Sequence, residues 1–307
     1  MSRAQATDGF NPKPGVPEQI TPMVRRILAP NPSPMTYRGT NSYLIGTRDI
    51  AVIDPGPASS SHLAALLAAL EPGQRISHIL VTHSHLDHSP LAAALQAETG
   101  APILAFGDFR AGRSAIMEEL VTQGVADGGE GMDREFACDR CLKDGEVVSA
   151  EGWSLEALHT PGHIGNHLCF ALGDTLFSGD HVMGWASSLV SPPDGDLTDF
   201  MASCRRLQHR RWTRFLPGHG DQVSEPAARL DWLIEHRLSR ETAILDHLRR
   251  ASANAAELTQ LIYTETPSAL LLAAERNVFA HLVDLHQRGK AQALGPLTTQ
   301  VRFAADI

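Results

Sequence analysis

One short segment, residues 81–89, constrains this chain more than any other because it holds three histidines and an aspartate within six positions. The preceding run, residues 76–81, reads Ile-Ser-His-Ile-Leu-Val and predicts a short buried strand. Ser89 and Pro90 are typical of an N-cap and a first helical position, which predicts a helix that ends at Gly100. The polar side chains are therefore expected on a strand-to-helix turn, where loops on a rigid scaffold often carry chemistry.

The spacing of these polar residues predicts two metal-binding points. His83 and His85 are two positions apart, so an extended backbone projects both to the same side. Asp87 and His88 follow where the chain turns, and they can reach a second point nearby. We infer one metal ion at the first pair and another at the second. The alternative, a surface loop that is rich in histidine by chance, fits poorly with the buried strand before it.

Three further polar residues recur downstream, each beside a glycine at a predicted turn. They are His163, Asp180 and His219. A lone histidine is more often a satisfied core or surface residue, but four such segments in this order indicate one composite site. Gly162 is expected to supply the unusual backbone geometry that turns His163 toward the metals.

The full pattern, His-x-His-x-Asp-His followed by a single His, Asp and His, resembles the metallo-β-lactamase superfamily of hydrolases, including its glyoxalase II-like members. The resemblance covers roughly residues 23–235. It implies an α/β fold, an αββα sandwich with the metals at one edge of the two sheets. It also implies one metal ion on three histidines, a second on three other residues and one bridging carboxylate: His83, His85 and His163; Asp87, His88 and His219; and Asp180.

This ligand set predicts hydrolysis by a metal-bridging hydroxide. Two divalent ions about 3.5–4 Å apart lower the pKa of a shared water and stabilise the charge of the transition state. Asp87 is the candidate catalytic residue, because it would orient the attacking water or accept its proton. Zinc is the expected metal, with iron and manganese as alternatives.

Other polar residues are candidates for supporting roles. Asp54 is interpreted either as a partner that orients a ligand histidine or as a turn residue before Pro55. His181 follows Asp180 directly and is a second candidate for such support. His167 is interpreted as a polar residue without a role in the site.

Composition describes an ordinary soluble globular protein. The 307 residues favour one large domain plus a smaller one. The net charge of −9 argues against broad affinity for nucleic acid or an anionic membrane. Four irregularly spaced cysteines predict a reduced, cytoplasmic protein, and the single pair Cys138 and Cys141 is interpreted as structural or incidental rather than as half a zinc site or a redox pair.

Residues 1–20 are expected to form a surface arm or mobile tail, because they are rich in proline and lack the apolar core of a secretory signal. No later apolar run approaches the ~20 residues of a membrane span, so no membrane is expected as a partner. Residues 21–235 are assigned to the hydrolase domain. Within it, residues 107–131 are expected to be an irregular excursion or a mobile lid.

Residues 236–307 predict a winged-helix-like domain of helices followed by a small β-wing. Asn254 and Glu257 are typical of a capping box, and residues 268–287 of an amphipathic helix that stops at Gly289. With this region included, nearly the whole chain resembles the β-lactamase-like protein 2 subgroup. Members of that subgroup have been linked to cleavage of single-stranded RNA.

Two charge patterns bear on nucleic acid. Residues 204–214 form the most basic run, which is interpreted as a solvated helix face or as a rim that attracts anionic substrates. Residues 236–290 hold seven basic and six acidic residues, so DNA binding is not expected. We expect this region to have a packing role or to form a homodimer.

Three functions remain open from the sequence. The first is a dinuclear hydrolase of an ester, a thioester or a phosphodiester, with single-stranded RNA and small thioesters as the competing substrates. The second is an iron-dependent redox enzyme on the same scaffold. The third is a non-catalytic metal-binding regulatory protein.

Overall fold

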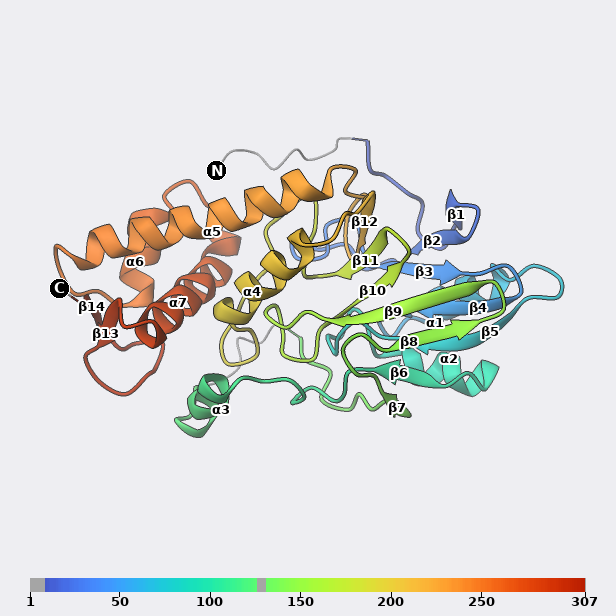
Figure 1. Cartoon of the computed structure of the whole chain (residues 1–307), viewed down its shortest axis with the longest axis horizontal. Helices are drawn as coiled ribbons and strands as arrows, with labels where there is room; N and C mark the ends of the chain where they lie inside the picture. The colour runs from blue at the N-terminus through green and yellow to red at the C-terminus, as the bar shows by residue number, and fades with distance from the viewer. Residues whose placement is uncertain (1–8, 126–130, 307) are drawn as a thin grey trace.

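Two β-sheets stacked face to face dominate the computed structural model, which describes residues 9–125 and 131–306 (Figure 1). The first sheet has seven strands in sequence order: β1 (Glu18–Thr21), β2 (Val24–Leu28), β3 (Asn41–Ile45), β4 (Asp49–Ile53), β5 (Arg75–Leu80), β6 (Ile103–Ala105) and β7 (Arg140–Cys141). The second has five strands in the order β12-β11-β10-β9-β8: β8 (Val147–Ala150), β9 (Trp153–His159), β10 (Leu168–Leu172), β11 (Thr175–Gly179) and β12 (Arg214–Pro217).

The space between the sheets is filled by apolar side chains from both inner faces. Tyr43 on β3 meets Phe177 on β11 edge to face, with ring centroids 5.1 Å apart, and both rings are buried. Leu80 on β5 packs in the same core as Phe170 on β10. Burial of such large side chains is the main force that holds the two sheets together.

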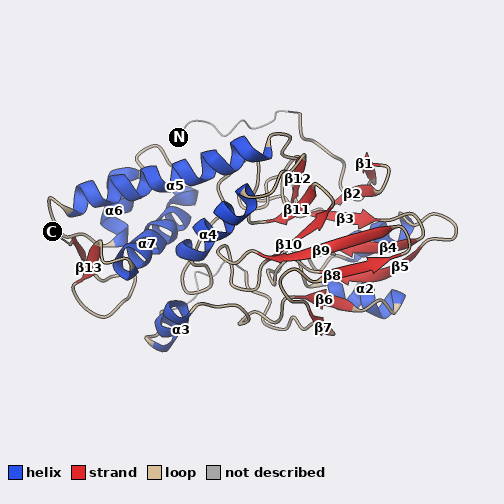
Figure 2. Cartoon of the chain, viewed as in Figure 1, coloured by secondary structure: helices blue, strands red, loops and turns tan. Residues whose placement is uncertain are grey.

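Helices cover the outer face of each sheet (Figure 2). On the first sheet these are α1 (Ser60–Ala68) and α2 (Leu91–Thr99), whose leucines join a core with the outward-facing residues of β4 and β5. On the second sheet they are α4 (Leu197–Gln208) and α5 (Pro226–Leu248). The arrangement confirms the predicted αββα sandwich.

The C-terminal part forms the predicted winged helix. It contains α6 (Ala255–Ile262), a 3₁₀ turn (Ser268–Leu270), α7 (Leu271–Gln287) and a hairpin of β13 (Ala291–Ala293) and β14 (Phe303–Ala305). The capping box of Asn254 and Glu257 is present at the start of α6. None of the helices in the described residues combines the length and the apolar character that a bilayer crossing requires.

Phe10 is buried against Tyr37, with ring centroids 6.1 Å apart, while most other residues between 9 and 17 are exposed, and β1 begins at residue 18. The described part of the N-terminal segment therefore agrees with the expected surface arm. The expectation for the next segment needs correction. Residues 107–131 include α3 (Ala115–Thr122), because Met117 and Leu120 bury against the C-terminal helices; residues 126–130 of this expected lid lie outside the described residues.

The start of one helix also differs from the prediction. Pro90 occupies the N-cap position of α2, no side chain caps this end, and the Ser89 hydroxyl donates to Asp133 at 2.6 Å. Helix α5 runs without a break through residues 235 and 236, so the division into units at 21–235 and 236–307 stays a prediction.

Candidate metal centre

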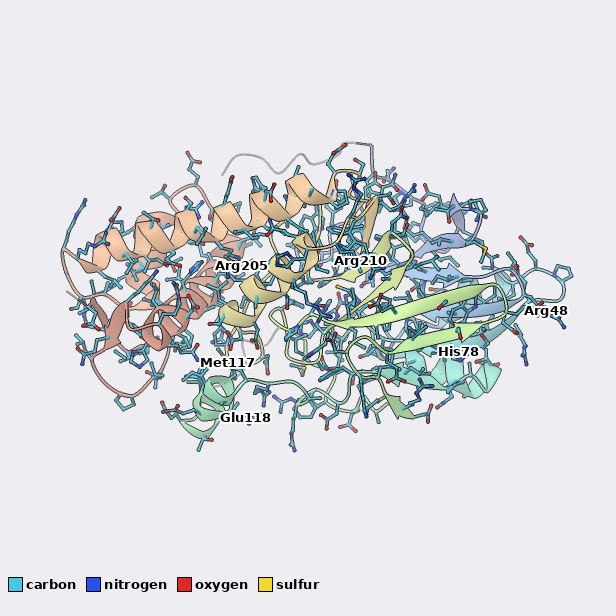
Figure 3. All side chains as sticks on the ribbon, in the orientation of Figure 1. Arg48, His78, Met117, Glu118, Arg205 and Arg210 are labelled. Carbon is cyan, nitrogen blue, oxygen red and sulfur yellow. The ribbon has the colours of Figure 1, made fainter. Side chains whose placement is uncertain are left out.

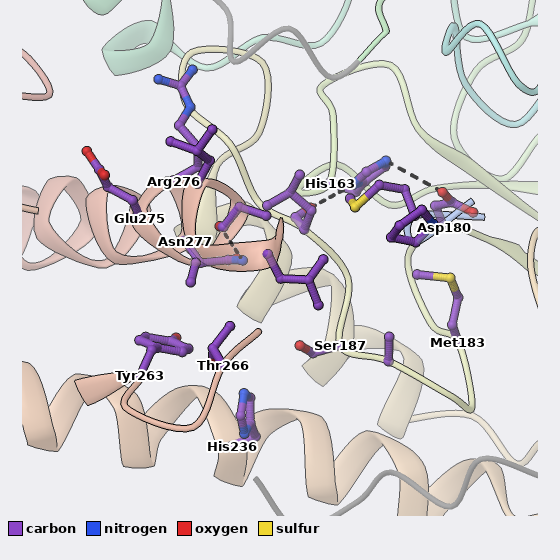
Figure 4. A pocket seen from close by; sticks show the side chains of 18 of the residues that line it. His163, Asp180, Met183, Ser187, His236, Tyr263, Thr266, Glu275, Arg276 and Asn277 are labelled. Carbon is purple, nitrogen blue, oxygen red and sulfur yellow. Dashed lines mark hydrogen bonds and ion pairs between the residues drawn. The ribbon is translucent and has the colours of Figure 1, made fainter. Parts of the chain in front are cut away.

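All seven predicted ligands lie at one edge of the sandwich because each follows the end of a strand. His83, His85, Asp87 and His88 follow β5, and Asp180 follows β11 directly. His163 follows β9 and His219 follows β12. The parallel pairs β4–β5 and β11–β12 bring these carboxyl ends to the same side of the molecule. Figure 4 shows His163 and Asp180 at one end of a pocket.

The first group consists of three histidines. The Nδ1 atom of His85 lies 3.0 Å from Nε2 of His83 and 3.1 Å from Nε2 of His163. Their three ligand atoms all lie within 4.8 Å of one another, and all three residues are buried. Burial lowers the pKa of His85 to about 3, so its ring is neutral near pH 7 and has a lone pair for a cation.

The second group consists of two carboxylates and two histidines. The Nε2 atom of His219 lies 3.0 Å from Oδ2 of Asp87, 3.3 Å from Oδ2 of Asp180 and 3.3 Å from Nε2 of His88. These four ligand atoms also lie within 4.8 Å of one another.

Charge, rather than burial, sets the pKa values in the second group. Burial alone would lower the pKa of His219, but Asp180 and Asp87 outweigh burial and raise the pKa to about 10. Conversely, burial would raise the pKa of Asp87, but His88 and His219 hold it well below its usual range. The carboxylates are therefore ionised, and their negative charge is stabilised by nearby positive charge from protonated histidines or from a divalent ion.

Asp180 lies between the two groups. Its Oδ2 is 3.9 Å from Nε2 of His163 in the first group and 3.3 Å from His219 in the second. Its Oδ1 is buried, accepts no hydrogen bond within the described residues and lies 3.5 Å from Nε2 of His88. A buried carboxylate oxygen without a donor is costly unless a cation contacts it. The imidazole and carboxylate donors, together with this oxygen, fit two divalent ions that share Asp180.

Backbone or carboxylate groups orient the outer ring nitrogen of several ligand histidines. Nδ1 of His163 lies 2.7 Å from the Leu189 carbonyl oxygen, and Nδ1 of His219 lies 3.1 Å from the Gly39 carbonyl oxygen. These contacts fix each ring and its tautomer, as partners of metal-bound histidines usually do.

Asp54 contacts a ligand histidine directly. Its Oδ2 lies 2.9 Å from Nδ1 of His88 and accepts the Thr82 hydroxyl at 2.8 Å, while its Oδ1 accepts the Thr82 N–H at 2.7 Å. The Thr82 hydroxyl in turn lies 2.9 Å from Nδ1 of His83. Asp54 therefore links one histidine of each group, which favours the orienting role over that of a simple turn residue.

The contacts of His181 and His167 favour the opposite of what the sequence suggested for the two residues. The ring of His181 contacts Cys204, with Nε2 3.5 Å from Sγ. The ring of His167 accepts the N–H of Asp180 at 3.2 Å, and Thr160 fixes its other nitrogen at 2.9 Å. The antiparallel pairing of β9 with β10 places His167 there, a signal that spacing along the chain did not contain.

Two glycines allow the close approach of ligands and neighbours. A Cβ at Gly218 would lie 2.5 Å from Oδ1 of Asp180 and 2.7 Å from Cε1 of His88. Gly162 has φ of +142°, and a Cβ there would lie 2.3 Å from the Cα of Phe200. The expected backbone freedom at Gly162 is therefore present, and Gly218 is required for a different reason, the lack of space beside two ligands.

The ligand groups open into a large pocket of about 1390 Å³ between the sandwich and the C-terminal helices (Figure 4). His85, Asp87 and His219 line one end. The lining comes from the sandwich loops, from α5 and from the α6–α7 region, so both parts of the molecule contribute to it.

The basic run of residues 204–214 lies outside this pocket. Arg206 forms an ion pair with Asp144 at 2.8 Å, and Arg210 forms one with Glu156 at 2.6 Å. Figure 3 shows Arg205 and Arg210 along the α4 side of the molecule, and none of the run lines the pocket. The expected anion-attracting rim is therefore not part of the pocket wall.

The Cys138 and Cys141 pair also lies apart from the ligands. Their sulfur atoms are 3.6 Å apart at β7, the edge strand of the first sheet. Neither cysteine belongs to a group of three or more metal-binding side chains among the described residues.

A two-sheet sandwich with histidine and aspartate ligands at one edge defines a metallo-β-lactamase-type hydrolase, and sequence comparison agrees. Residues 35–219 match the metallo-beta-lactamase superfamily model, and residues 255–296 match the beta-lactamase associated winged helix domain. The chain therefore belongs to the metallo-β-lactamase superfamily and carries the winged helix associated with it.

Several curated proteins resemble the chain over most of its length. A beta-lactamase-like protein 2 homolog of Drosophila melanogaster is 32% identical over 285 residues, covering 89% of this chain and 90% of that protein. A protein of Claviceps purpurea named atrochrysone carboxyl ACP thioesterase is 30% identical over 270 residues, covering 85% of this chain and 78% of that protein. The first match confirms the subgroup resemblance.

Solved structures share the fold. A beta-lactamase domain protein from Burkholderia ambifaria superposes with a TM-score of 0.80 at 20% identity, covering 98% of this chain and 96% of that one. A metallo-beta-lactamase family protein from Thermus thermophilus gives a TM-score of 0.74 at 24% identity, covering 94% and 100%. At these sequence identities, the two structures show only that the chain shares their fold.

Proposed function

We propose that this protein is a dinuclear metal-dependent hydrolase whose substrates are thioesters. The observation that carries the proposal is that two complete ligand groups share Asp180 and open into one large pocket. When bound there, two divalent ions, for which zinc is our first choice, would activate a water molecule and polarise the carbonyl of the substrate.

The protein's own residues would position the reactants. Asp87 is exposed to the pocket on about a quarter of its side chain, and its Oδ2 lies 3.0 Å from His219. As an ionised carboxylate it would orient the attacking water. His163 and Asp180 also line the pocket. They are held by the Leu189 carbonyl and the His167 ring, respectively.

The size and apolar lining of the pocket support a small organic substrate over RNA. The volume exceeds the ~300–1000 Å³ of ordinary small-molecule sites, which leaves room for a long or polycyclic acyl group. Leu270, Leu272 and Phe279 give the lining an apolar component. The most basic run of the sequence, residues 204–214, lies outside the pocket, on the end of α4 and the segment that leads into β12. The relative from Claviceps purpurea, named as an acyl carrier protein thioesterase, supports the same class.

The experiment is a direct comparison of substrates. Purified zinc-loaded protein is incubated with a panel of acyl thioesters and with a labelled single-stranded RNA, and Asp87→Ala is assayed in parallel. We expect thioester hydrolysis that falls at least about 100-fold in Asp87→Ala. Cleavage of the RNA without thioester hydrolysis would overturn the substrate class. Metal loading without either activity would instead favour a non-catalytic metal-binding protein.

The identity of the metal is tested separately. Elemental analysis of the protein as purified is expected to give about two ions per chain, with zinc predominating. Iron as the main metal, together with oxygen uptake or peroxide reduction, would favour the redox alternative on this scaffold.

A further inference from the structure

The end of the pocket away from the metal ligands is lined by α5 and by the segment that joins α6 to α7. Figure 4 shows His236 projecting from α5 toward Tyr263 and Thr266, across the pocket from Asp180. His236 stacks on Trp232, with ring centroids 4.9 Å apart and an angle of 9° between the rings. This end therefore presents flat aromatic surfaces.

Arg237, which lines the pocket at this end, is a buried cation without a carboxylate partner among the described residues. It is 2% exposed, and it donates to Oδ1 of Asn277 at 2.8 Å and to the carbonyl oxygen of Ser188. Its Nε has no acceptor in the described part of the chain, and no ion pair joins it to a described carboxylate. The Phe200 ring, whose centre lies 5.1 Å from the guanidinium carbon, compensates part of this buried charge, and a bound anion would compensate more of it.

Arg240, about one helical turn further along α5, also lacks a carboxylate partner among the described residues. It lines the same pocket, its guanidinium lies 4.9 Å from the centre of the Tyr263 ring, and its buried Nε has no acceptor among the described residues. The nearby Glu241 is not available to it, because that carboxylate pairs with Arg288 and Lys290. Two arginines thus face one end of a cavity, and no described carboxylate pairs with either.

Acidic residues of the lining do not offset this charge. Glu275 points away from His236 and Tyr263 in Figure 4. Glu235 also lines a separate surface hollow with Arg205 and His209. The pKa of His236 reflects the same positive charge. Burial lowers it most, and the nearby Arg237, Arg240 and Arg229 lower it further, to about 4.

We propose that this end of the pocket is a subsite for an anionic group of the substrate, with Arg240 as its direct partner and Arg237 as the buried charge behind it. The bound group would be a carboxylate on the acyl part or a phosphate on the thiol part, since both accept hydrogen bonds from guanidinium groups. Tyr263 and His236 would pack against the adjoining part of the substrate. The inference rests on the proposed thioester hydrolysis for the identity of the substrate and on the geometry of α5 for the charge.

Three thioesters separate the two sources of negative charge. Hexanoyl N-acetylcysteamine is neutral, adipoyl N-acetylcysteamine adds a carboxylate at the end of an acyl chain of equal length, and hexanoyl coenzyme A adds phosphates on the thiol side. In Arg240→Gln we expect KM to rise about 10- to 100-fold for one charged substrate, the loss typical of a charge-assisted hydrogen bond. The KM for the neutral thioester should change less than about twofold.

Arg250→Gln is the matched control, because it removes the same charge from an exposed position outside the pocket. It should leave all three KM values as in the unmodified protein. Arg240→Lys, which keeps the charge, should recover part of the affinity, and circular dichroism checks that each variant is folded. An equal change for charged and neutral substrates in Arg240→Gln would overturn the subsite.

A binding measurement keeps this inference separate from the proposed function. Adipate and inorganic phosphate are titrated calorimetrically into the metal-loaded protein and into Arg240→Gln. We expect one of these anions to bind at least about 10-fold more weakly to the variant. That result without any thioester hydrolysis would reject the proposed function and keep the subsite. Thioester hydrolysis together with unchanged anion binding in Arg240→Gln would keep the proposed function and reject the subsite.

Discussion

Asp54 has an uncommon backbone conformation for a non-glycine residue, with φ of +51°. Aspartate tolerates this left-handed region better than most residues. The conformation, at the end of β4, aims both carboxylate oxygens at the loop after β5, where they meet Thr82 and His88. A residue that shares no segment with the ligands thus determines how two of them are held.

Asp54→Asn tests that role with little change in shape. Asparagine tolerates the same backbone conformation, but its amide cannot neutralise and orient His88 as the carboxylate does. We expect metal affinity to fall about 10- to 100-fold, as for other partners of metal-bound histidines. Zinc affinity is measured by competition with a chromophoric chelator.

Asp49→Asn is the control for this change. Asp49 pairs with the exposed Arg75 at the other end of β4, so its loss should not affect zinc binding. Unchanged affinity in Asp54→Asn would show that Asp54 only forms the turn before Pro55.

His167 and His181 provide a second test at the scale of single residues. Both are fully buried histidines, but only His167 contacts the backbone of Asp180 through its ring. We expect His167→Ala to weaken zinc binding about 10-fold or more, and His181→Ala to leave it unchanged although both variants lose stability. Equal zinc affinities in the two variants would contradict the positioning role of His167.

Local sequence could predict the candidate ligands but not the groups that support them. The seven predicted ligands were readable because each stands beside a turn at the end of an apolar strand. His167 and the arginines of α5 were not readable, because their roles depend on strand pairing and on helix packing between distant segments. His181 follows Asp180 in the turn after β11, and the sequence did not show that its ring would contact Cys204.

Among the elements, α3 shows how a segment without a clear pattern can still fold. Many glycines and acidic residues around it predicted irregular structure. The helix forms because Met117 and Leu120 find a buried surface on the C-terminal helices, where they join Phe279 and Leu282. Tertiary packing therefore outweighs weak local preference. Figure 3 shows Met117 and Glu118 on this helix, apart from the main sandwich.

Substitutions of a buried and an exposed residue of α3 test whether this helix contributes to the stability of the protein through its packing. Leu120 is fully buried, whereas the neighbouring Val121 is 41% exposed. Leu120→Ala is expected to lower the free energy of unfolding by about 2–5 kcal/mol, because it leaves a cavity in a shared core. Val121→Ala should change it by less than about 0.5 kcal/mol. Urea denaturation measures both, and similar values for the two variants would show that α3 is not anchored in solution.

At the scale of the whole molecule, buried neutral histidines link stability to pH. His62 is 1% exposed, and its Nε2 lies 2.8 Å from the Ser42 hydroxyl between α1 and β3. Burial lowers its pKa from 6.5 to about 4. The folded state therefore binds fewer protons than the unfolded state between these values, so the contribution of His62 to stability is present above pH 6.5 and is lost as pH falls toward 4.

We expect this single group to account for about 2 kcal/mol of the stability lost between pH 7 and pH 5. In His62→Gln, which cannot titrate, the free energy of unfolding should fall less steeply over that range. His209→Gln, at an exposed position, is the control. Thermal or urea denaturation at several pH values gives the slopes, and identical slopes in His62→Gln and the unmodified protein would contradict the assignment.

Helix α5 connects the second sheet to the C-terminal helices, so its length sets how these two parts are rotated relative to each other. It begins against the second sheet and continues, without interruption, to the helices that close the pocket. Each residue added to an α-helix turns everything beyond it by about 100° and advances it by about 1.5 Å. A single-residue insertion near the middle of α5 would therefore swing Arg237, Arg240 and the whole winged helix out of alignment with ligands that it never touches. The length of this helix therefore sets how the C-terminal wall of the pocket is placed relative to the candidate ligands.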